Sequence, residues 1–246
     1  MSSQNYQSYK AWDRTTRIFH WVNVLSLFTM IVLGLIILNG DNFGLEGEGK
    51  VFMKTVHVLV GYVFVINLAW RIIWAFIGTK SARWSSILPI GKGYLSSLKA
   101  FIAGEKSGKP LYYLGHNPLG RIAVTLLLIL CISQATTGLV IAGTDIYFPP
   151  FGAMITEWIA APGVDPSTLV AGTKDMVDPE AYKEMRAFRS PYINLHVYGF
   201  YAICVMVSVH ILAVISAEVK QGGGLISAMI TGKKVLPKEP VDLDQG

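Results

Sequence analysis

Four stretches of the chain are apolar over about 20 residues or more, at residues 17–38, 55–77, 119–142 and 191–217. A helix of about 20 residues crosses the roughly 30 Å apolar core of a bilayer, so each stretch is long enough to span it once. Strands would have to close into a barrel that four segments cannot make. The sequence predicts an all-α integral membrane protein, a four-transmembrane-helix bundle that forms one domain over residues 1–246.

The composition agrees with this class. The chain is 52% hydrophobic and only 15% charged, and its mean hydropathy is +0.45, which is typical of a membrane protein. The net charge of +5 raises the question of nucleic acid, but no basic run alternates with aromatic residues, so we expect no nucleic-acid partner. Cys131 and Cys204 both lie in apolar runs and form neither a zinc motif nor a CxxCH motif for covalent haem.

The basic residues are distributed unevenly. Fifteen of the 21 Lys and Arg residues lie in the N-terminal tail and the start of the first span, between Arg71 and Arg121, or after Ala217. The other six lie in residues 39–54 and 143–190, together with ten of the 16 acidic residues. The positive-inside rule then places both termini and the loop 78–118 in the cytoplasm of a bacterium, with the protein in the inner membrane.

The connections also carry structural signals. We expect the long periplasmic loop 143–190 to be folded and functional, with an acidic helical patch at 178–184. Apolar and basic residues between Trp84 and Phe101 favour a helix that lies along the lipid headgroups. The polar tail after Gly224 is expected to be frayed.

Four of the five histidines lie within or at the ends of the apolar stretches, where ionisable groups are costly and usually functional. His196 and His210 are 14 residues apart, nearly four helical turns, so they share a face about 21 Å apart along the axis. His20 begins the outward-going first span, and His57 begins the inward-going second span. The expected depths therefore pair His57 with His196 near the periplasm and His20 with His210 near the cytoplasm.

Two facing imidazoles at each depth suit the axial ligation of haem. Zinc would require four ligands at one depth, and the spans supply no Cys, Asp or Glu beside the histidines. The sequence predicts two noncovalent haem b groups, with iron bound by His57 and His196 and by His20 and His210. Any single one of these histidines could instead be a hydrogen-bonded core residue. That interpretation does not explain why all four pair by depth.

Further residues share faces with these histidines. Gly34 is 14 residues after His20, while Gly61 and Gly199 lie one turn after His57 and His196; they would let a macrocycle approach the backbone, or they could simply be packing glycines.

Two arginines belong to the expected inner site. Arg17 and Arg71 are expected near the cytoplasmic haem as propionate partners, or they could be interface anchors.

His116 stands apart, in Gly115-His116-Asn117-Pro118 just before the third span. Asn117 and Pro118 mark a helix start, so one reading is a surface cap. The other is a hydrogen-bond donor or proton carrier to a quinone near the inner haem, with Asn117 and Arg83 as further candidates for that site. Both readings stay open.

These residues resemble a known family, the membrane cytochrome b subunits of nickel-iron hydrogenases, within the superfamily of bacterial di-haem b-type cytochromes. The resemblance covers almost the whole chain in order, and it is carried by Trp12-Asp13, Arg17 and His20-Trp21; Met53, His57 and Gly61; the run from Arg71 to Gly78; Gly115-His116-Asn117-Pro118; and His196 with His210.

The resemblance implies an electron-transfer subunit of a quinone-linked oxidoreductase complex. Electrons from the iron-sulfur small subunit of a periplasmic enzyme would enter at the outer haem, reach the inner haem and reduce a membrane quinone. It matches His57 and His196 to the outer ligands and His20 and His210 to the inner ones. The loop 143–190 is longer than expected of a hydrogenase subunit, which leaves the cytochrome subunit of another periplasmic oxidoreductase as an alternative.

Three other classes compete with this interpretation. A self-contained superoxide-to-quinone oxidoreductase would need exposed basic residues outside, whereas the periplasmic loop is net acidic. A transporter or metal-handling protein would need clustered ligands and broken helices at mid-membrane. A purely structural membrane anchor would leave the paired histidine depths unexplained.

Overall fold

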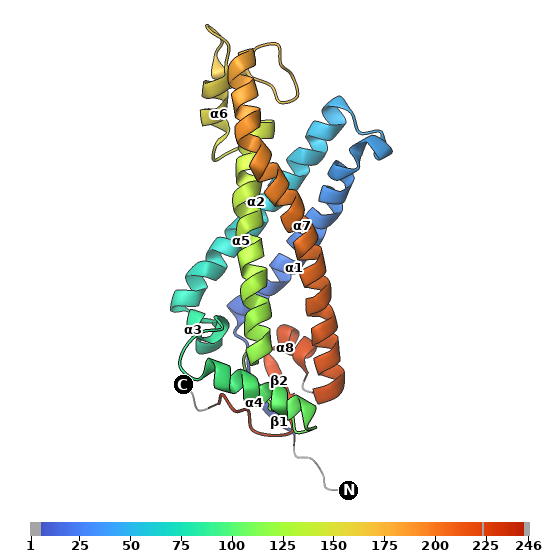
Figure 1. Cartoon of the computed structure of the whole chain (residues 1–246), viewed down its shortest axis with the longest axis vertical. Coiled ribbons are helices and arrows are strands. Elements are labelled where there is room, and N and C mark those ends of the chain that lie inside the picture. Colours follow the sequence, from blue (N-terminus) through green and yellow to red (C-terminus); the bar gives the residue numbers. More distant parts are fainter. Residues whose placement is uncertain (1–5, 223, 244–246) are drawn as a thin grey trace. The chain divides into compact units, whose positions relative to one another are not determined.

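A computed structural model describes residues 6–222 and 224–243. Four long helices dominate it (Figure 1), namely α1 (Arg14–Leu38), α2 (Gly47–Ile77), α5 (Pro118–Ile146) and α7 (Pro179–Gln221). Each is long and apolar enough to cross a membrane. The four predicted spans are therefore confirmed, and the protein is a multi-pass helical membrane protein.

Two of the helices are longer than the predicted spans. α2 begins at Gly47 rather than residue 55, and α7 begins at Pro179 rather than residue 191. The predictions followed hydropathy, but a helix needs only its own backbone hydrogen bonds and so continues beyond the apolar stretch. Pro191 consequently lies inside α7 rather than at its start. The acidic patch begins that helix, where carboxylates favour the positive end of the helix dipole.

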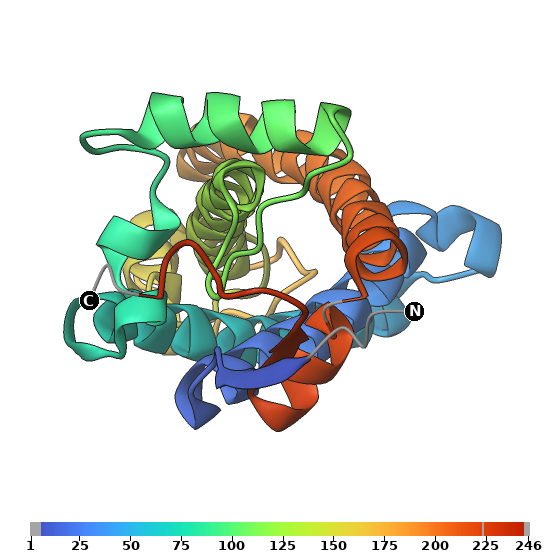
Figure 2. The same cartoon turned by 90° about the horizontal axis from the view of Figure 1, so that it is seen from below.

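Short elements fill the connections. η1 (Gly40–Phe43) joins α1 to α2, and η2 (Lys80–Ala82), α3 (Trp84–Ile87) and α4 (Tyr94–Lys106) lie between α2 and α5. The single helix expected between Trp84 and Phe101 is instead two helices, α3 and α4, because the chain turns through Gly91 and Gly93, which both have positive φ. α4 runs crosswise to the start of α5 (Figure 2). The buried Tyr94 hydroxyl donates to the Pro118 carbonyl at 2.9 Å, which ties α4 to the first residue of α5.

The C-terminal tail is folded. α8 (Leu225–Thr231) packs Ala228 against Trp12, and β2 (Lys233–Leu236) pairs antiparallel with β1 (Gln7–Lys10). Lys234 in this ribbon is only 3% exposed. The expectation of a frayed tail is therefore wrong for the described residues up to 243, because the strand partner comes from the opposite end of the chain and has no local signal.

The connection between α5 and α7 folds on its own small core. It contains α6 (Gly152–Ile159) and η3 (Pro166–Thr168), and its buried residues Ile155 and Ile159 pack against Met185 of α7. The chain turns back sharply after α5, where a Cβ on Gly152 would clash with the backbone of Tyr147. Glycine is required at this close approach.

The chain divides into two compact units. Among the described residues, unit 1 comprises 6–22, 67–129, 203–222 and 224–243, and unit 2 comprises 23–66 and 130–202. Each of the four long helices contributes a segment to both units. His20 and His210 fall in unit 1, whereas His57 and His196 fall in unit 2, so each predicted ligand pair lies within one unit.

Candidate functional site

In unit 2, α2 and α7 bring His57 and His196 together. The two imidazole rings are half-buried, and their centroids lie 6.3 Å apart with an angle of 74° between the ring planes. A metal–imidazole nitrogen bond is about 2 Å long, and a ring centre lies about 1 Å behind its nitrogen, so two imidazoles on opposite sides of one metal ion have centroids about 6 Å apart. The observed separation is compatible with two ligands of one iron.

α5 orients one of these rings. Thr137 is 2% exposed, and its hydroxyl lies 2.8 Å from the Ser133 carbonyl and 2.9 Å from Nδ1 of His196. A hydroxyl has one proton. When Thr137 donates that proton to Ser133, it accepts from Nδ1–H of His196. This tautomer leaves the lone pair on Nε2, the atom that can bind a metal.

Small residues surround the same pair. A Cβ on Gly34 would come 3.7 Å from Cε1 of His57, and one on Gly138 would come 3.3 Å from Cε1 of His196. The contact at Gly138 is tight, whereas the one at Gly34 is an ordinary van der Waals distance. Gly34 therefore lies beside His57, and its predicted role at a haem stays a prediction.

The other two predicted glycines contact different neighbours. A Cβ on Gly61 would meet Sδ of Met30 at 3.9 Å, an ordinary packing distance. A Cβ on Gly199 would clash with Gln134, whose amide donates to the His196 carbonyl at 3.1 Å. Gly199 thus makes room for a polar contact to the backbone of the histidine helix.

A charged cluster lies at the end of unit 2 where α5 finishes. Asp145 accepts from Lys54 Nζ at 2.5 Å and from Arg189 Nη1 at 2.7 Å. Nη1 of Arg189 also donates to the Thr144 carbonyl at 3.2 Å. The side chains of Lys54, Asp145 and Arg189 are 27%, 25% and 12% exposed. Nε of Arg189 is buried without a partner among the described residues.

In unit 1, the second predicted pair lies within electrostatic range. His20 on α1 is close enough to His210 on α7 for a charge on one ring to affect the other, and Nδ1 of His20 is buried without a hydrogen-bond partner in the described part of the chain. The two arginines expected nearby contact backbone carbonyls. Arg71 is buried and donates to Ala82 at 3.1 Å, and Arg17 donates to Ile230.

The quinone candidates occupy different environments. Asn117 accepts from the Gly120 amide at 2.7 Å and caps α5, as the sequence predicts. Arg83 is exposed and donates from Nε to the Gly78 carbonyl at 3.0 Å. His116 packs on Trp12 with ring centroids 4.8 Å apart, and its Nδ1 is buried without a partner in the described residues.

The surroundings of His116 are electropositive. Burial, together with the charges of Lys234 and Arg71 and smaller contributions from His210 and Arg121, lowers the pKa of His116 to about 3. The imidazole is therefore neutral near pH 7 and can accept or donate one hydrogen bond. This environment does not fit the reading of His116 as a surface cap.

The histidines fit haem better than a clustered metal site. Across residues 6–222 and 224–243, no group of three or more His, Cys, Asp and Glu side chains could hold a metal ion. The histidines occur instead as pairs on separate helices, with glycines beside His57 and His196, and Nδ1 of His20 and of His57 has no hydrogen-bond partner in the part of the chain that the structure describes. Paired neutral imidazoles with room beside them are the ligand set of a bis-histidine haem.

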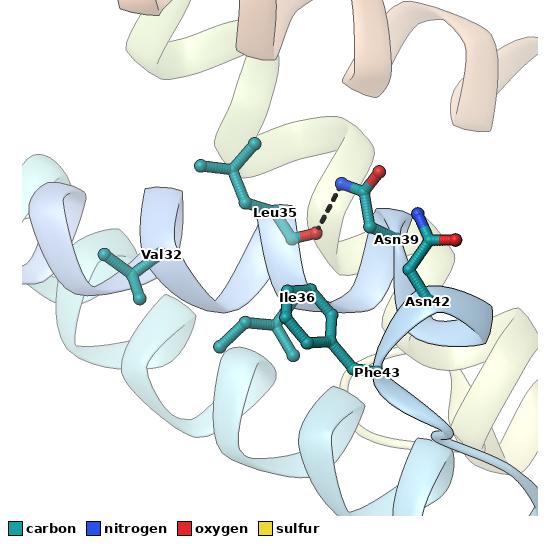
Figure 3. Close-up of a pocket in the computed structure, with 6 residues that line it drawn as sticks. All are labelled: Val32, Leu35, Ile36, Asn39, Asn42 and Phe43. Atoms are coloured by element: carbon teal, nitrogen blue, oxygen red, sulfur yellow. Dashed lines mark hydrogen bonds between the residues drawn. The ribbon is translucent and has the colours of Figure 1, made fainter.

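A separate pocket of about 500 Å³ lies in unit 2 at the junction of α1 and η1 (Figure 3). Nδ2 of Asn39 donates to the Leu35 carbonyl within α1 at 2.8 Å. None of the lining side chains is titratable or a common metal ligand, and we assign no chemistry to this pocket. Its lining residues are Val32, Leu35, Ile36, Asn39, Asn42 and Phe43.

Sequence reasoning missed Thr137, Gly138 and the cluster of Lys54, Asp145 and Arg189. Lys54 is one turn from His57, and Arg189 is two turns from His196, so their spacing along the helices could have indicated them. Thr137 and Gly138 come from α5, which carries no histidine, and only the packing of three helices identifies them.

Similar proteins are known. The chain is 24% identical over 243 residues to the "Probable Ni/Fe-hydrogenase B-type cytochrome subunit" of Rhizobium leguminosarum bv. viciae, covering 93% of this chain and 90% of that protein. It is 24% identical over 242 residues to the protein of the same name from Rhodobacter capsulatus, covering 94% of this chain and 83% of the relative. The predicted resemblance is confirmed.

A shorter match involves the "Probable Ni/Fe-hydrogenase 1 B-type cytochrome subunit" of Escherichia coli (strain K12), at 26% identity over 147 residues, 55% of this chain and 61% of that protein. No solved structure matches the chain. The family described as "Prokaryotic cytochrome b561" matches residues 11–232, nearly the whole chain. The chain therefore belongs to the prokaryotic cytochrome b561 family, and haem b is the cofactor that this membership implies.

Proposed function

We propose that this protein is a di-haem b-type cytochrome of the bacterial inner membrane that passes electrons between a periplasmic redox partner and membrane quinone. His57 and His196 would hold the outer haem iron, and His20 and His210 the inner one. Haem, when bound, supplies one-electron redox chemistry. The protein supplies the ligands, their orientation and the surrounding charges.

The separation of the His57 and His196 rings is the observation that carries this proposal. Two half-buried imidazoles from different helices have ring centroids 6.3 Å apart, and the Thr137 hydroxyl lies 2.9 Å from Nδ1 of His196, which favours the tautomer whose Nε2 lone pair can bind a metal. Leaving four ionisable side chains inside membrane helices without a ligand would be costly. Their division into one pair in each unit supports two haems rather than one.

A quinone site beside the inner haem is supported by His116. Of the candidates His116, Asn117 and Arg83, the last two have polar atoms engaged by the backbone, while His116 retains a buried ring nitrogen without a partner among the described residues. A neutral imidazole can donate a hydrogen bond to a quinone oxygen. Arg17 and Arg71 would hold inner-haem propionates.

The partner is proposed from the relatives. Proteins that align over most of this chain are named as B-type cytochrome subunits of Ni/Fe hydrogenase. We infer an iron-sulfur subunit of that kind on the periplasmic side, where the orientation from the basic residues places the folded connection between α5 and α7. Both termini would then be cytoplasmic.

Haem content and spectra test the function. Purified protein should give a reduced-minus-oxidised b-type spectrum, with a pyridine haemochrome value of about two haems per chain. A preparation that keeps its helices but contains no haem would defeat the proposal. Substituting His57→Ala or His196→Ala should abolish one spectral component, and His20→Ala or His210→Ala the other. His116→Ala is the matched control and should retain both, whereas loss of one shared component in His57→Ala and His210→Ala would overturn the pairing.

A further inference from the structure

The cluster of Lys54, Asp145 and Arg189 carries a positive charge that its own ion pairs do not neutralise. One carboxylate serves two cations, so the cluster has a net charge of plus one. The Arg189 side chain is only 12% exposed, and both of its hydrogen bonds leave from Nη1. A largely buried cation with unused donors is unfavourable unless an anion completes the site.

The unused donors have a defined chemistry. Nε of Arg189 is buried and has no partner among the described residues, and Nε with Nη2 forms the edge of a guanidinium that grips a carboxylate through two parallel hydrogen bonds. The Lys54 ammonium has three donors, of which Asp145 takes one. The cluster is therefore equipped for carboxylate oxygens beyond those of Asp145.

The location of the cluster identifies the carboxylate. Lys54 precedes His57 by three residues on α2, about 4.5 Å along the axis. Arg189 precedes His196 by seven residues on α7, two turns on the same helix face and about 10 Å along the axis. Both cations thus lie on the same side of the paired histidines, toward the helix ends that begin α2 and α7. A haem carries two propionates at one edge, and these charged groups favour the aqueous side of a membrane site.

We propose that Lys54 and Arg189 bind the propionates of the outer haem, and that Asp145 is a positioning residue that holds the two cations in place. This inference rests on the proposed function, since it requires a haem between His57 and His196. The propionates would supply the anion that the net positive cluster lacks. They would also define the orientation of the macrocycle, with its charged edge toward Lys54 and Arg189.

Redox titration of the purified cytochrome, followed at both b-type spectral components, tests the inference. Removing a cation beside a haem favours the ferric state, so Arg189→Gln and Lys54→Met should lower the potential of one component. A tenfold change in the ferrous-to-ferric ratio corresponds to about 59 mV for one electron. Asp145→Asn removes an anion and should move the same component in the opposite direction. The second component should not move in any of the three.

The chain offers matched controls on the same helices. Arg186 on α7 is exposed, and Lys50 on α2 pairs with the exposed Asp41 at 3.7 Å. Arg186→Gln and Lys50→Met remove the same charges away from Asp145 and should leave both potentials unchanged. If Arg189→Gln does not accumulate, Arg189→Lys is the second variant, because it retains the charge but cannot make two parallel hydrogen bonds to a carboxylate. It should retain the wild-type potential but release haem faster than wild type.

The outcomes distinguish failure of the propionate site from failure of the proposed function. Two haems whose potentials respond to Arg189→Gln no more than to Arg186→Gln would overturn the propionate site and leave the proposed function standing. A wild-type protein without haem would overturn the proposed function itself. Opposite shifts for Arg189→Gln and Asp145→Asn, confined to the component lost in His57→Ala, would establish the site.

Discussion

The hydroxyl of Thr137 offers the sharpest test of how this protein would hold the proposed outer haem. Thr137→Val keeps the shape of the side chain and removes the group that lies 2.9 Å from Nδ1 of His196. The Nδ1–H donor would then be buried without a partner, which costs about 1–3 kcal/mol. Loss of such outer contacts of a metal-bound histidine lowers metal affinity by about 10- to 100-fold.

Transfer of haem from the purified cytochrome to an excess of a haem-scavenging protein measures this affinity. We expect Thr137→Val to release one of its two haems about 10- to 100-fold faster than wild type, while the component that depends on His20 and His210 is unchanged. The ring of His196 would also be free to turn, so the potential of the affected haem should shift. Thr137→Ser restores the hydroxyl and should restore both properties.

The neighbouring Thr136 supplies the control. It is exposed, and its hydroxyl donates to the Ile132 carbonyl at 2.9 Å. Thr136→Val therefore removes the same kind of intrahelical hydrogen bond from α5 without touching a histidine. Equal release rates and equal potentials for Thr136→Val and Thr137→Val would refute the orienting role of Thr137.

Two further predictions concern the folded tail. A chain ending at Gly222 loses the Met229 and Ile230 carbonyls, which accept hydrogen bonds from Trp21 and Arg17. Its spectrum should lack the component that requires His20 and retain the component that requires His57. A chain that stops at Asp244 should retain both components. Burial lowers the pKa of Lys234 to about 8, opposed by Asp242, below the value of about 10.4 in an unfolded chain. Between these two pKa values the unfolded chain therefore binds more protons than the folded chain. Burying the charged ammonium lowers the free energy of unfolding; this loss is fully present below about pH 8 and disappears as pH rises. The melting temperature of wild type relative to Lys234→Met should rise from pH 7 to 10; a constant difference would contradict the burial of this cation.

Much of the architecture is predictable from local patterns. Long apolar runs specify membrane helices because the bilayer offers no other hydrogen-bond partners to the backbone. The 14-residue spacing of His196 and His210 is a property of one helix and needs no tertiary information. The cap at Asn117 and the start of α5 at Pro118 follow from local residue preferences as well.

Hydropathy alone misjudged the helix ends and the tail. Polar residues continue α2 and α7 beyond the apolar runs, since helical hydrogen bonds do not depend on lipid. Lys234 looked like a solvent-exposed residue of a polar tail, but its ammonium donates to the carbonyls of Tyr113 and Gly115 at 3.0 Å each. Those acceptors lie more than 100 residues away in the chain.

The sequence by itself identified four membrane helices and the candidate ligand histidines, and it predicted an orientation from charge, because hydropathy and helical periodicity are local properties. Only the tertiary structure decided which groups surround those histidines. Thr137 and Asp145 come from α5, which contributes no ligand, and they reach His196 and Arg189 through side chains of different helices. Such contacts depend on how helices pack and rotate against each other, which no spacing within a single helix specifies.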